Sequence, residues 1–153
     1  MNRIRGRSNG LVGSADGAVV SYIFNEETGE LREQSKQSTS GIDPCHLSLD
    51  KSGKWLLSVN YTTGSVCLHP IGDHGEIEPM ADFNQRVGRS VRDNRQEEPH
   101  CHMINNIPGT DYWLVPDLGT DSIVIFRHDA ANRKLIHHGG CPFFMESMSW
   151  IAP

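Results

Sequence analysis

The amino-acid sequence predicts an all-β protein made of short antiparallel strands. Helical periodicity is almost absent, and short apolar runs rich in β-branched and aromatic residues recur along the chain. Turn-forming segments such as NEETGE, DKSG, TTGS and LGTD separate these runs with glycine, asparagine and aspartate. The expected strands are AVVSYIF (18–24), WLLSV (55–59), SVCLHPI (65–71), YWLV (112–115) and SIVIF (122–126).

An internal repeat predicts how these strands are grouped. The matching segments are 45–71 with 101–128 and, as a partial copy, 17–31 with 64–77. Each unit contains four expected strands, and the units recur with a period of about 47 to 57 residues. Four-stranded units of that length are typical of β-propeller blades. The sequence therefore predicts a β-propeller fragment with about two full four-stranded blades and a partial N-terminal blade.

The repeat also sets the expected boundaries. We expect residues 1–135 to form the propeller part, with blade units at about 17–42, 43–97 and 98–135. Residues 136–153 are expected to be an irregular tail, because their aromatic residues follow no blade rhythm. Blades pack face to face in rings that usually hold four to eight of them. Apolar faces would therefore stay uncovered, which indicates a fragment of a longer ring.

Composition disfavours several classes of partner. The chain has 14 lysines and arginines against 19 acidic residues, a formal net charge of −5. This balance disfavours general binding to nucleic acid or to a membrane surface. The four cysteines are widely spaced, which is typical of reduced thiols in the cytosol. With no visible signal peptide and no apolar run near the roughly 20 residues that cross a bilayer, we expect a soluble, cytoplasmic protein.

Three motifs resemble a known family in residues, order and spacing. They are SVNYTTGSVCLHPI (58–71), RQEEPHCH (95–102) and VPDLGTDSIVIFRHD (115–129). The resemblance is to the seven-bladed propeller family of 6-phosphogluconolactonases, which also contains the fungal carboxymuconate cyclases. It implies hydrolysis of a phosphorylated sugar lactone in the pentose phosphate pathway without a metal or other cofactor. It also implies that roughly half of the ring lies outside this chain.

Lactone hydrolysis needs a base, donors for the developing oxyanion, and cations for a phosphate. The segment RQEEPHCH offers all three. We predict His100 as the general base, because a neutral imidazole accepts a proton at physiological pH. Arg95 is expected to hold the oxyanion or the phosphate, and Glu97 to orient His100 and favour its charged form. These three are the predicted catalytic residues.

The predicted substrate-binding residues lie in the same loop and at two equivalent strand ends. They are Arg92, Gln96, His102, Asn60 and Asp117. The arginine is expected to contact a phosphate. The two strand-end residues are equally compatible with facing a central cleft and with capping turns. The two earlier arginines of the loop, Arg86 and Arg89, are expected to be solvated.

The repeat separates the histidines of this region. His46 falls on His102 and Cys45 on Cys101, and features that recur in both blades favour a packing role. His100 has no such counterpart, because Pro44 stands at its position. The aromatic residues Trp55, Tyr112 and Trp113 are likewise expected to pack the blades.

Three alternatives remain open at this point. A carboxymuconate-type cycloisomerase would use the same base and the same anion-binding arginines on a different substrate. A non-catalytic propeller fragment would instead associate with another chain or with itself through exposed blade faces. Zinc would accept the ligands of the HCH segment, but the spacing matches no common zinc site. We therefore expect no metal, no cofactor, no nucleic acid and no membrane, and a phosphorylated sugar lactone as the small-molecule partner.

Overall fold

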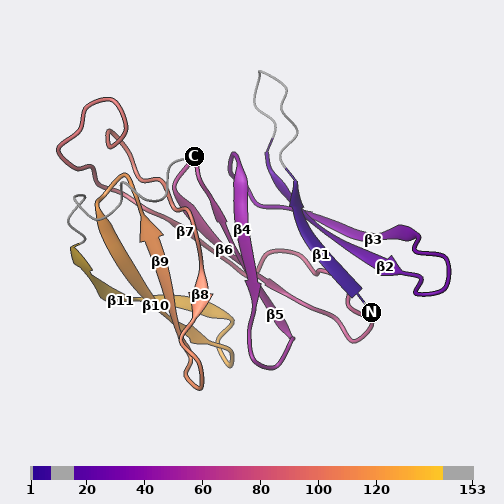
Figure 1. Ribbon diagram of the computed structural model, residues 1–153. Helices are drawn as coiled ribbons and strands as arrows, with labels where there is room; N and C mark the ends of the chain where they lie inside the picture. The colour runs from indigo at the N-terminus through magenta and orange to yellow at the C-terminus, as the bar shows by residue number, and fades with distance from the viewer. Residues whose placement is uncertain (1, 8–15, 143–153) are drawn as a thin grey trace.

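The structure is a computed structural model that describes residues 2–7 and 16–142, with side chains described from residue 16 onward. The regular elements of this part are β-strands in three antiparallel sheets (Figure 1). The first sheet contains β1 (Asn2–Arg7), β2 (Ala18–Phe24) and β3 (Leu31–Ser38). The second contains β4 (Pro44–Leu49), β5 (Trp55–Asn60), β6 (Ser65–Pro70) and β7 (Asp82–Gln85). The third contains β8 (Asn105–Asn106), β9 (Tyr112–Asp117), β10 (Ser122–Asp129) and β11 (Lys134–Pro142).

The predicted all-β propeller fragment is confirmed. Two four-stranded sheets follow a three-stranded one, and Figure 1 shows the second sheet between the other two. The strands of each four-stranded sheet are neighbours in chain order, as in a propeller blade. The registers agree with the internal repeat, because Asn60 pairs with Ser65 as its counterpart Asp117 pairs with Ser122.

Part of the expected irregular tail is a regular strand. Residues 136–142 belong to β11, which pairs with β10 from Asp129↔Lys134 to Ser122↔Pro142. The pairing contains an irregularity between Val124 and Phe126. Most of β11 is exposed, so it lacks the apolar alternation by which strands are found in a sequence. Residues 143–153 lie outside the described residues.

The second sheet has two chemically different faces, because successive side chains of a strand point to opposite sides. Leu57 pairs with Leu68 and Val59 with Val66, so one face is apolar. The other face carries the alternate pairs, which are Leu56 with His69, Ser58 with Cys67, and Asn60 with Ser65. All of these side chains are buried, which places both faces against neighbouring sheets.

The apolar face packs against the third sheet. We call this contact between the second and third sheets the second junction. Its largest fully buried side chains are Trp113 and Phe126, and Trp55 packs at its edge. The predicted packing roles of Trp55 and Trp113 are therefore confirmed. The buried members of this cluster are Leu57, Val59, Val66, Leu68, Cys101, Ile104, Trp113, Val115, Val124, Phe126 and Leu135.

The polar face of the second sheet packs against the first sheet, and we call this contact the first junction. Three side chains of β5 and β6 hydrogen-bond to backbone carbonyls at the end of β3. Asn60 donates to the Thr39 oxygen at 3.1 Å, and the Cys67 thiol donates to the same oxygen at 3.0 Å. His69 Nε2 lies 3.1 Å from the Ser38 oxygen. Buried apolar packing here comes from Val19, Leu56 and Ile77.

None of the segments 2–7 and 16–142 forms a helix with the length and hydropathy that a membrane crossing requires.

Candidate functional site

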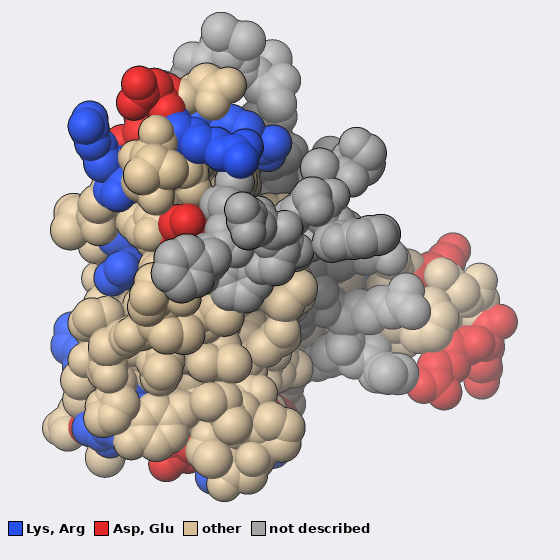
Figure 2. Space-filling view, turned by 60° about the vertical axis from the view of Figure 1, so that its left-hand side comes forward, with Lys and Arg blue, Asp and Glu red and all other residues tan. Residues whose placement is uncertain are grey.

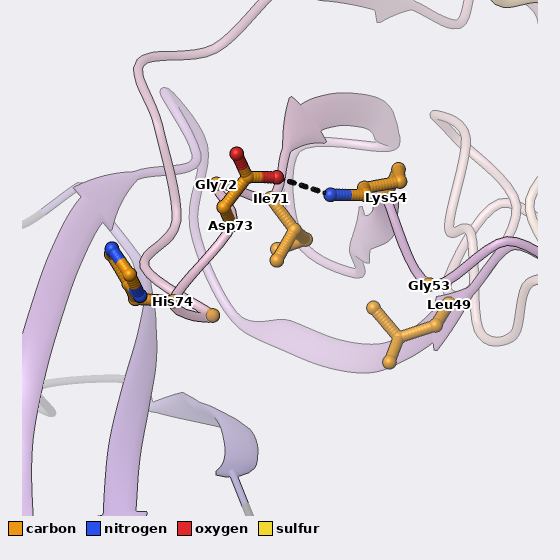
Figure 3. Close-up of a pocket in the computed structure, with 8 residues that line it drawn as sticks. Leu49, Gly53, Lys54, Ile71, Gly72, Asp73 and His74 are labelled. Atoms are coloured by element: carbon orange, nitrogen blue, oxygen red, sulfur yellow. Dashed lines mark hydrogen bonds and ion pairs between the residues drawn. The ribbon is translucent and has the colours of Figure 1, made fainter.

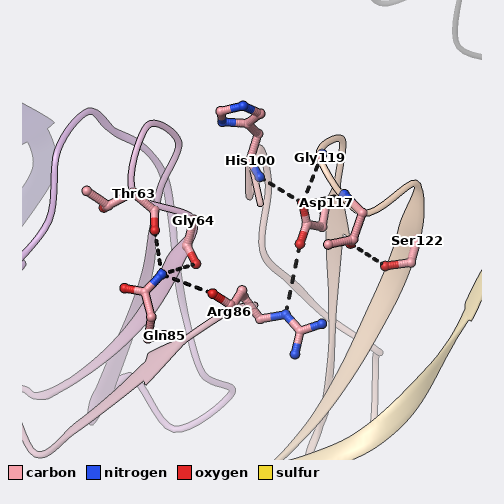
Figure 4. Close-up of polar contacts among 9 residues, drawn as sticks. Thr63, Gly64, Gln85, Arg86, His100, Asp117, Gly119 and Ser122 are labelled. Carbon is pink, nitrogen blue, oxygen red and sulfur yellow. Dashed lines mark hydrogen bonds and ion pairs between the residues drawn. The ribbon is translucent and has the colours of Figure 1, made fainter. Parts of the chain in front are cut away.

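The RQEEPHCH motif lies in the connection between β7 and β8, which we call the 86–104 loop. The loop runs across the turns that join β5 to β6 and β9 to β10 (Figure 4). A Cβ atom at Gly64, whose φ is +57°, would overlap the carbonyl group of Pro99. A Cβ at Gly119 would overlap the carbonyl oxygen of Glu98. Glycine in the NYTTGS and DLGTDS motifs therefore lets the two turns approach the loop from either side.

Asp117 joins the loop to the β9–β10 turn. One carboxylate oxygen accepts hydrogen bonds from three backbone amides: His100 at 2.8 Å, Gly119 at 3.0 Å and Thr120 at 3.3 Å. The side chain is fully buried. Of the two roles left open for Asp117, the structure shows the turn-capping one. The carboxylate oxygen that caps the turn also accepts the backbone amide of His100.

Arg86 is not the solvated loop charge that we expected. Its side chain is 19% exposed, and its Nε lies 3.9 Å from the second carboxylate oxygen of Asp117 (Figure 4). Neither of these two atoms has a hydrogen-bond partner among the described residues. The backbone amide of Arg86 also donates to the Gly64 oxygen at 3.0 Å. The buried carboxylate thus has a compensating cation, which a desolvated charge requires.

The imidazole of His100 points away from Asp117 in Figure 4. Its Nδ1 lies 3.1 Å from the carbonyl oxygen of Tyr61. The two rings are stacked, with centroids 4.8 Å apart and planes 18° from parallel. In the described part of the chain no hydrogen bond or ion pair joins His100 to Glu97, which is exposed. The ring is therefore oriented by Tyr61 and the backbone by Asp117.

His102 contacts the same Tyr61 ring as His100. Its ring is 5.7 Å from the Tyr61 ring and edge-on to it, at 89°, and its side chain is exposed. The counterpart His46 has the packing role that the repeat predicted, because its Nδ1 accepts the backbone amide of Ile104 at 3.3 Å. Burial lowers the pKa of His46, and the nearby His102 lowers it further. His46 thus joins the second sheet to the end of the 86–104 loop, while His102 stays accessible.

The remaining predicted residues divide between the surface and the interior. Arg92 and Arg95 are exposed on the loop, and Figure 2 shows basic and acidic side chains together at the upper end of the molecule. Gln96 is buried: its amide donates to the Leu118 oxygen at 2.9 Å and its carbonyl accepts the Arg92 amide at 3.2 Å. Asn60 lies in the first junction, buried and bonded to Thr39 and Ser65. These two amides therefore hold the local fold.

The structure brings His100, His102 and Asp117 together and adds two residues that sequence reasoning missed as partners, Tyr61 and Arg86. Tyr61 lies in the NYTTGS motif that resembles the family. The internal repeat does not single it out, because its aligned counterpart Leu118 is not aromatic.

The buried thiols are poor nucleophiles. Burial raises the pKa of Cys67 to about 12 and also raises the pKa of Cys101. Burial likewise raises the pKa of Cys45, whose thiol lies 3.4 Å from the carbonyl oxygens of Cys101 and His102. Among the described residues no group of three or more His, Cys, Asp and Glu side chains is placed to hold a metal ion.

A hollow lies at the opposite ends of the second-sheet strands (Figure 3). It is lined by the β4–β5 turn and by the segment after β6, with Leu49, Ile71 and His74 among its side chains. Lys54 and Asp73 form an ion pair of 2.5 Å across it, and both side chains are largely exposed. An exposed pair of this kind contributes little stability. This hollow contains none of the predicted site residues.

Comparison with known proteins identifies the family of the chain. The family described as "Lactonase, 7-bladed beta-propeller" matches residues 8–146. The chain belongs to this lactonase family. A 6-phosphogluconolactonase of Bacillus subtilis (strain 168) is 30% identical over 111 residues, covering 72% of this chain and 32% of that protein. A 6-phosphogluconolactonase of Formosa agariphila is also 30% identical over 111 residues, covering 72% of this chain and 31% of that protein.

A solved structure of the lactonase type shows the same fold. The periplasmic gluconolactonase of Pseudomonas aeruginosa has a TM-score of 0.82 at 26% identity, covering 94% of this chain and 41% of that chain. The predicted family is therefore confirmed. The chain spans about a third of the length of the two curated relatives.

Proposed function

We propose that this chain contributes the His100 end of the cleft in an enzyme that hydrolyses 6-phospho-D-glucono-1,5-lactone to 6-phosphogluconate, a step of the pentose phosphate pathway. The observation that carries the proposal is the arrangement of the 86–104 loop. It presents an oriented imidazole at His100, and exposed arginines follow one another along the same loop. The relatives named 6-phosphogluconolactonase support the substrate class.

In the proposed reaction His100 removes a proton from a water molecule while the water oxygen attacks the lactone carbonyl. The bond from the carbonyl carbon to the ring oxygen then breaks, and the departing oxygen takes the proton from His100. Arg95 and Arg92 hold the phosphate or the oxyanion, because a guanidinium binds either with paired hydrogen bonds. His102 lies beside the substrate. Glu97 remains a proposed partner of His100 in the substrate complex.

The buried polar residues take a supporting part in this proposal. Asp117 holds the His100 backbone, and Gln96 holds the loop that carries Arg92. Asn60 fixes the turn that leads to Tyr61 from the first junction. None of the steps requires a metal or a cofactor.

The test is loss of 6-phosphogluconolactone above its spontaneous rate, measured with the purified chain. His100→Ala should lower the rate about 10²–10⁴-fold, the usual contribution of a positioned general base. His137→Ala is the matched control, because this histidine is exposed on β11. An active His100→Ala variant would reject the proposal, and a folded chain without activity would show that this chain alone does not form a sufficient site.

Two other functions are separated by the same assay. A cycloisomerase would process a carboxylated diene acid and ignore the phosphorylated lactone. A non-catalytic fragment would process neither and would associate through its outer blade faces, which sedimentation of the purified chain would detect.

A further inference from the structure

Tyr61 contacts both accessible histidines of the candidate site. Its ring stacks on His100 at 4.8 Å and meets His102 edge-on at 5.7 Å. Its carbonyl oxygen faces the Nδ1 atom of His100 at 3.1 Å. One residue of the β5–β6 turn therefore touches the proposed base through its side chain and through its backbone.

The Tyr61 carbonyl is itself held in place. It accepts the backbone amide of Gly64 at 3.2 Å, and the amide of Tyr61 donates to the Asp43 oxygen at 2.8 Å. The carboxylate of Asp43 in turn accepts the hydroxyl of Thr62 at 2.5 Å. Contacts within the turn therefore set the direction of this carbonyl, independently of His100.

A carbonyl oxygen only accepts hydrogen bonds, so the contact requires a hydrogen on Nδ1 of His100. A neutral imidazole carries one hydrogen, which leaves a lone pair on Nε2. A histidine side chain free in water prefers the tautomer with its hydrogen on Nε2. The position of the Tyr61 carbonyl thus selects the less common form, and the stacked ring keeps the imidazole in the orientation that meets it.

We propose that Tyr61 is the positioning residue of the site: its carbonyl and its ring together hold His100 with hydrogen on Nδ1 and present Nε2 as the proton acceptor. The tautomer follows from geometry alone, and only the role of Nε2 as a base rests on the proposed function. The Tyr61 hydroxyl takes no part, because it has no hydrogen-bond partner among the described residues. A phenylalanine should therefore replace this tyrosine without loss.

The experiment is nitrogen-detected NMR of the histidine rings in the ¹⁵N-labelled chain at a pH where they are neutral, with the His100 signals identified by their loss in His100→Gln. The wild type and Tyr61→Phe should show hydrogen on Nδ1. Tyr61→Ala removes the stacked ring and should shift His100 toward the Nε2-protonated form. Tyr61→Leu serves as a second ringless variant, and the amide spectrum reports whether each variant is folded.

Hydrogen on Nε2 in the wild type would overturn the proposal, and so would an unchanged Nδ1 form in a folded ringless variant. A merely structural role of Tyr61 would lower stability without moving the tautomer. Where hydrolysis is measurable, Tyr61→Ala should lower kcat at least tenfold with little change in KM, and Tyr61→Phe should stay within twofold of wild type. Because the NMR result needs no activity, failure of the positioning role and failure of the proposed function are distinguishable.

Discussion

The two junctions of the second sheet bury its two faces by different means. At the first junction Asn60, Cys67 and His69 hydrogen-bond to the carbonyls of Ser38 and Thr39. At the second junction Trp113 and Phe126 belong to a continuous apolar cluster. Burial of apolar area is the larger favourable term in folding, whereas each buried hydrogen bond adds only about 1 kcal/mol net. The second junction is therefore the stronger of the two.

The candidate site lies across the stronger junction. His100 is held from the second sheet by Tyr61 and from the third sheet by Asp117. A site that depends on two sheets keeps its geometry only if the sheets do not move relative to each other. The apolar packing of the second junction thus fixes the two sheets that together hold the candidate site.

The largest expected effect comes from removing the central aromatic residue of the second junction. Trp113→Ala should lower the free energy of unfolding by about 3–5 kcal/mol, the usual cost of truncating a buried tryptophan. Leu56→Ala in the first junction should cost less, near the lower end of the range of about 2–5 kcal/mol for a buried leucine. Urea unfolding of the two variants measures both values. A larger loss for Leu56→Ala would reverse the ranking of the junctions.

A second comparison uses the close-packed glycines at the two junctions. Alanine at Gly119 would meet backbone atoms of Glu98 and Pro99, whereas alanine at Gly41 would meet the side-chain ends of Asn60 and Thr63. Backbone moves less easily than a side-chain end, so Gly119→Ala should cost about 1–3 kcal/mol and Gly41→Ala less.

Displacement of the loop is the second expected result of Gly119→Ala. The NMR signals of His100 should shift more in this variant than in Gly41→Ala, whose contacts reach His100 only through the β5–β6 turn. Equal unfolding midpoints for the two variants, with His100 unmoved in both, would show that the loop does not depend on this close approach.

The sequence predicts the strands that carry these junctions better than the contacts that form the site. Short apolar runs identify β5, β6, β9 and β10, since each buries at least one face against another sheet. The outer strands β3 and β11 are largely exposed and polar, so they give no such pattern. The inner strands were therefore predictable and the extent of the outer strands was not.

Within the site, the sequence identifies His100 because the repeat gives it no counterpart. It does not identify Tyr61 or Arg86 as partners, because their contacts join turns that are far apart in the chain. It also does not separate a buried amide such as Gln96 from an exposed one, since that depends on how the loop folds back on Leu118. Residue type and spacing select candidates, whereas burial assigns their roles.

The smallest expected effect is a pH dependence that belongs to the first junction. His69 is fully buried, its Nδ1 has no hydrogen-bond partner among the described residues, and burial lowers its pKa below the ordinary value of 6.5. Below pH 6.5 the unfolded chain therefore binds a proton at His69 more readily than the folded chain does. This contribution to stability is complete above pH 6.5 and is lost as the pH falls below it, by at most about 1.4 kcal/mol per pH unit for one proton.

His69→Gln should flatten this dependence, because a glutamine amide keeps a donor for the Ser38 oxygen and does not titrate. His128→Asn is the matched control at the second junction, where burial also lowers the pKa of the histidine but Asp50, Asp111 and Asp129 oppose the shift. Urea unfolding at pH 7.5 and pH 5.5 should therefore show a smaller loss on acidification for His69→Gln than for the wild type, with His128→Asn closer to the wild type. If His128→Asn reduced the loss of stability on acidification more than His69→Gln did, the acid-sensitive contact would belong to the second junction. The polar composition of the first junction would then not explain which contact between sheets weakens first as the pH falls.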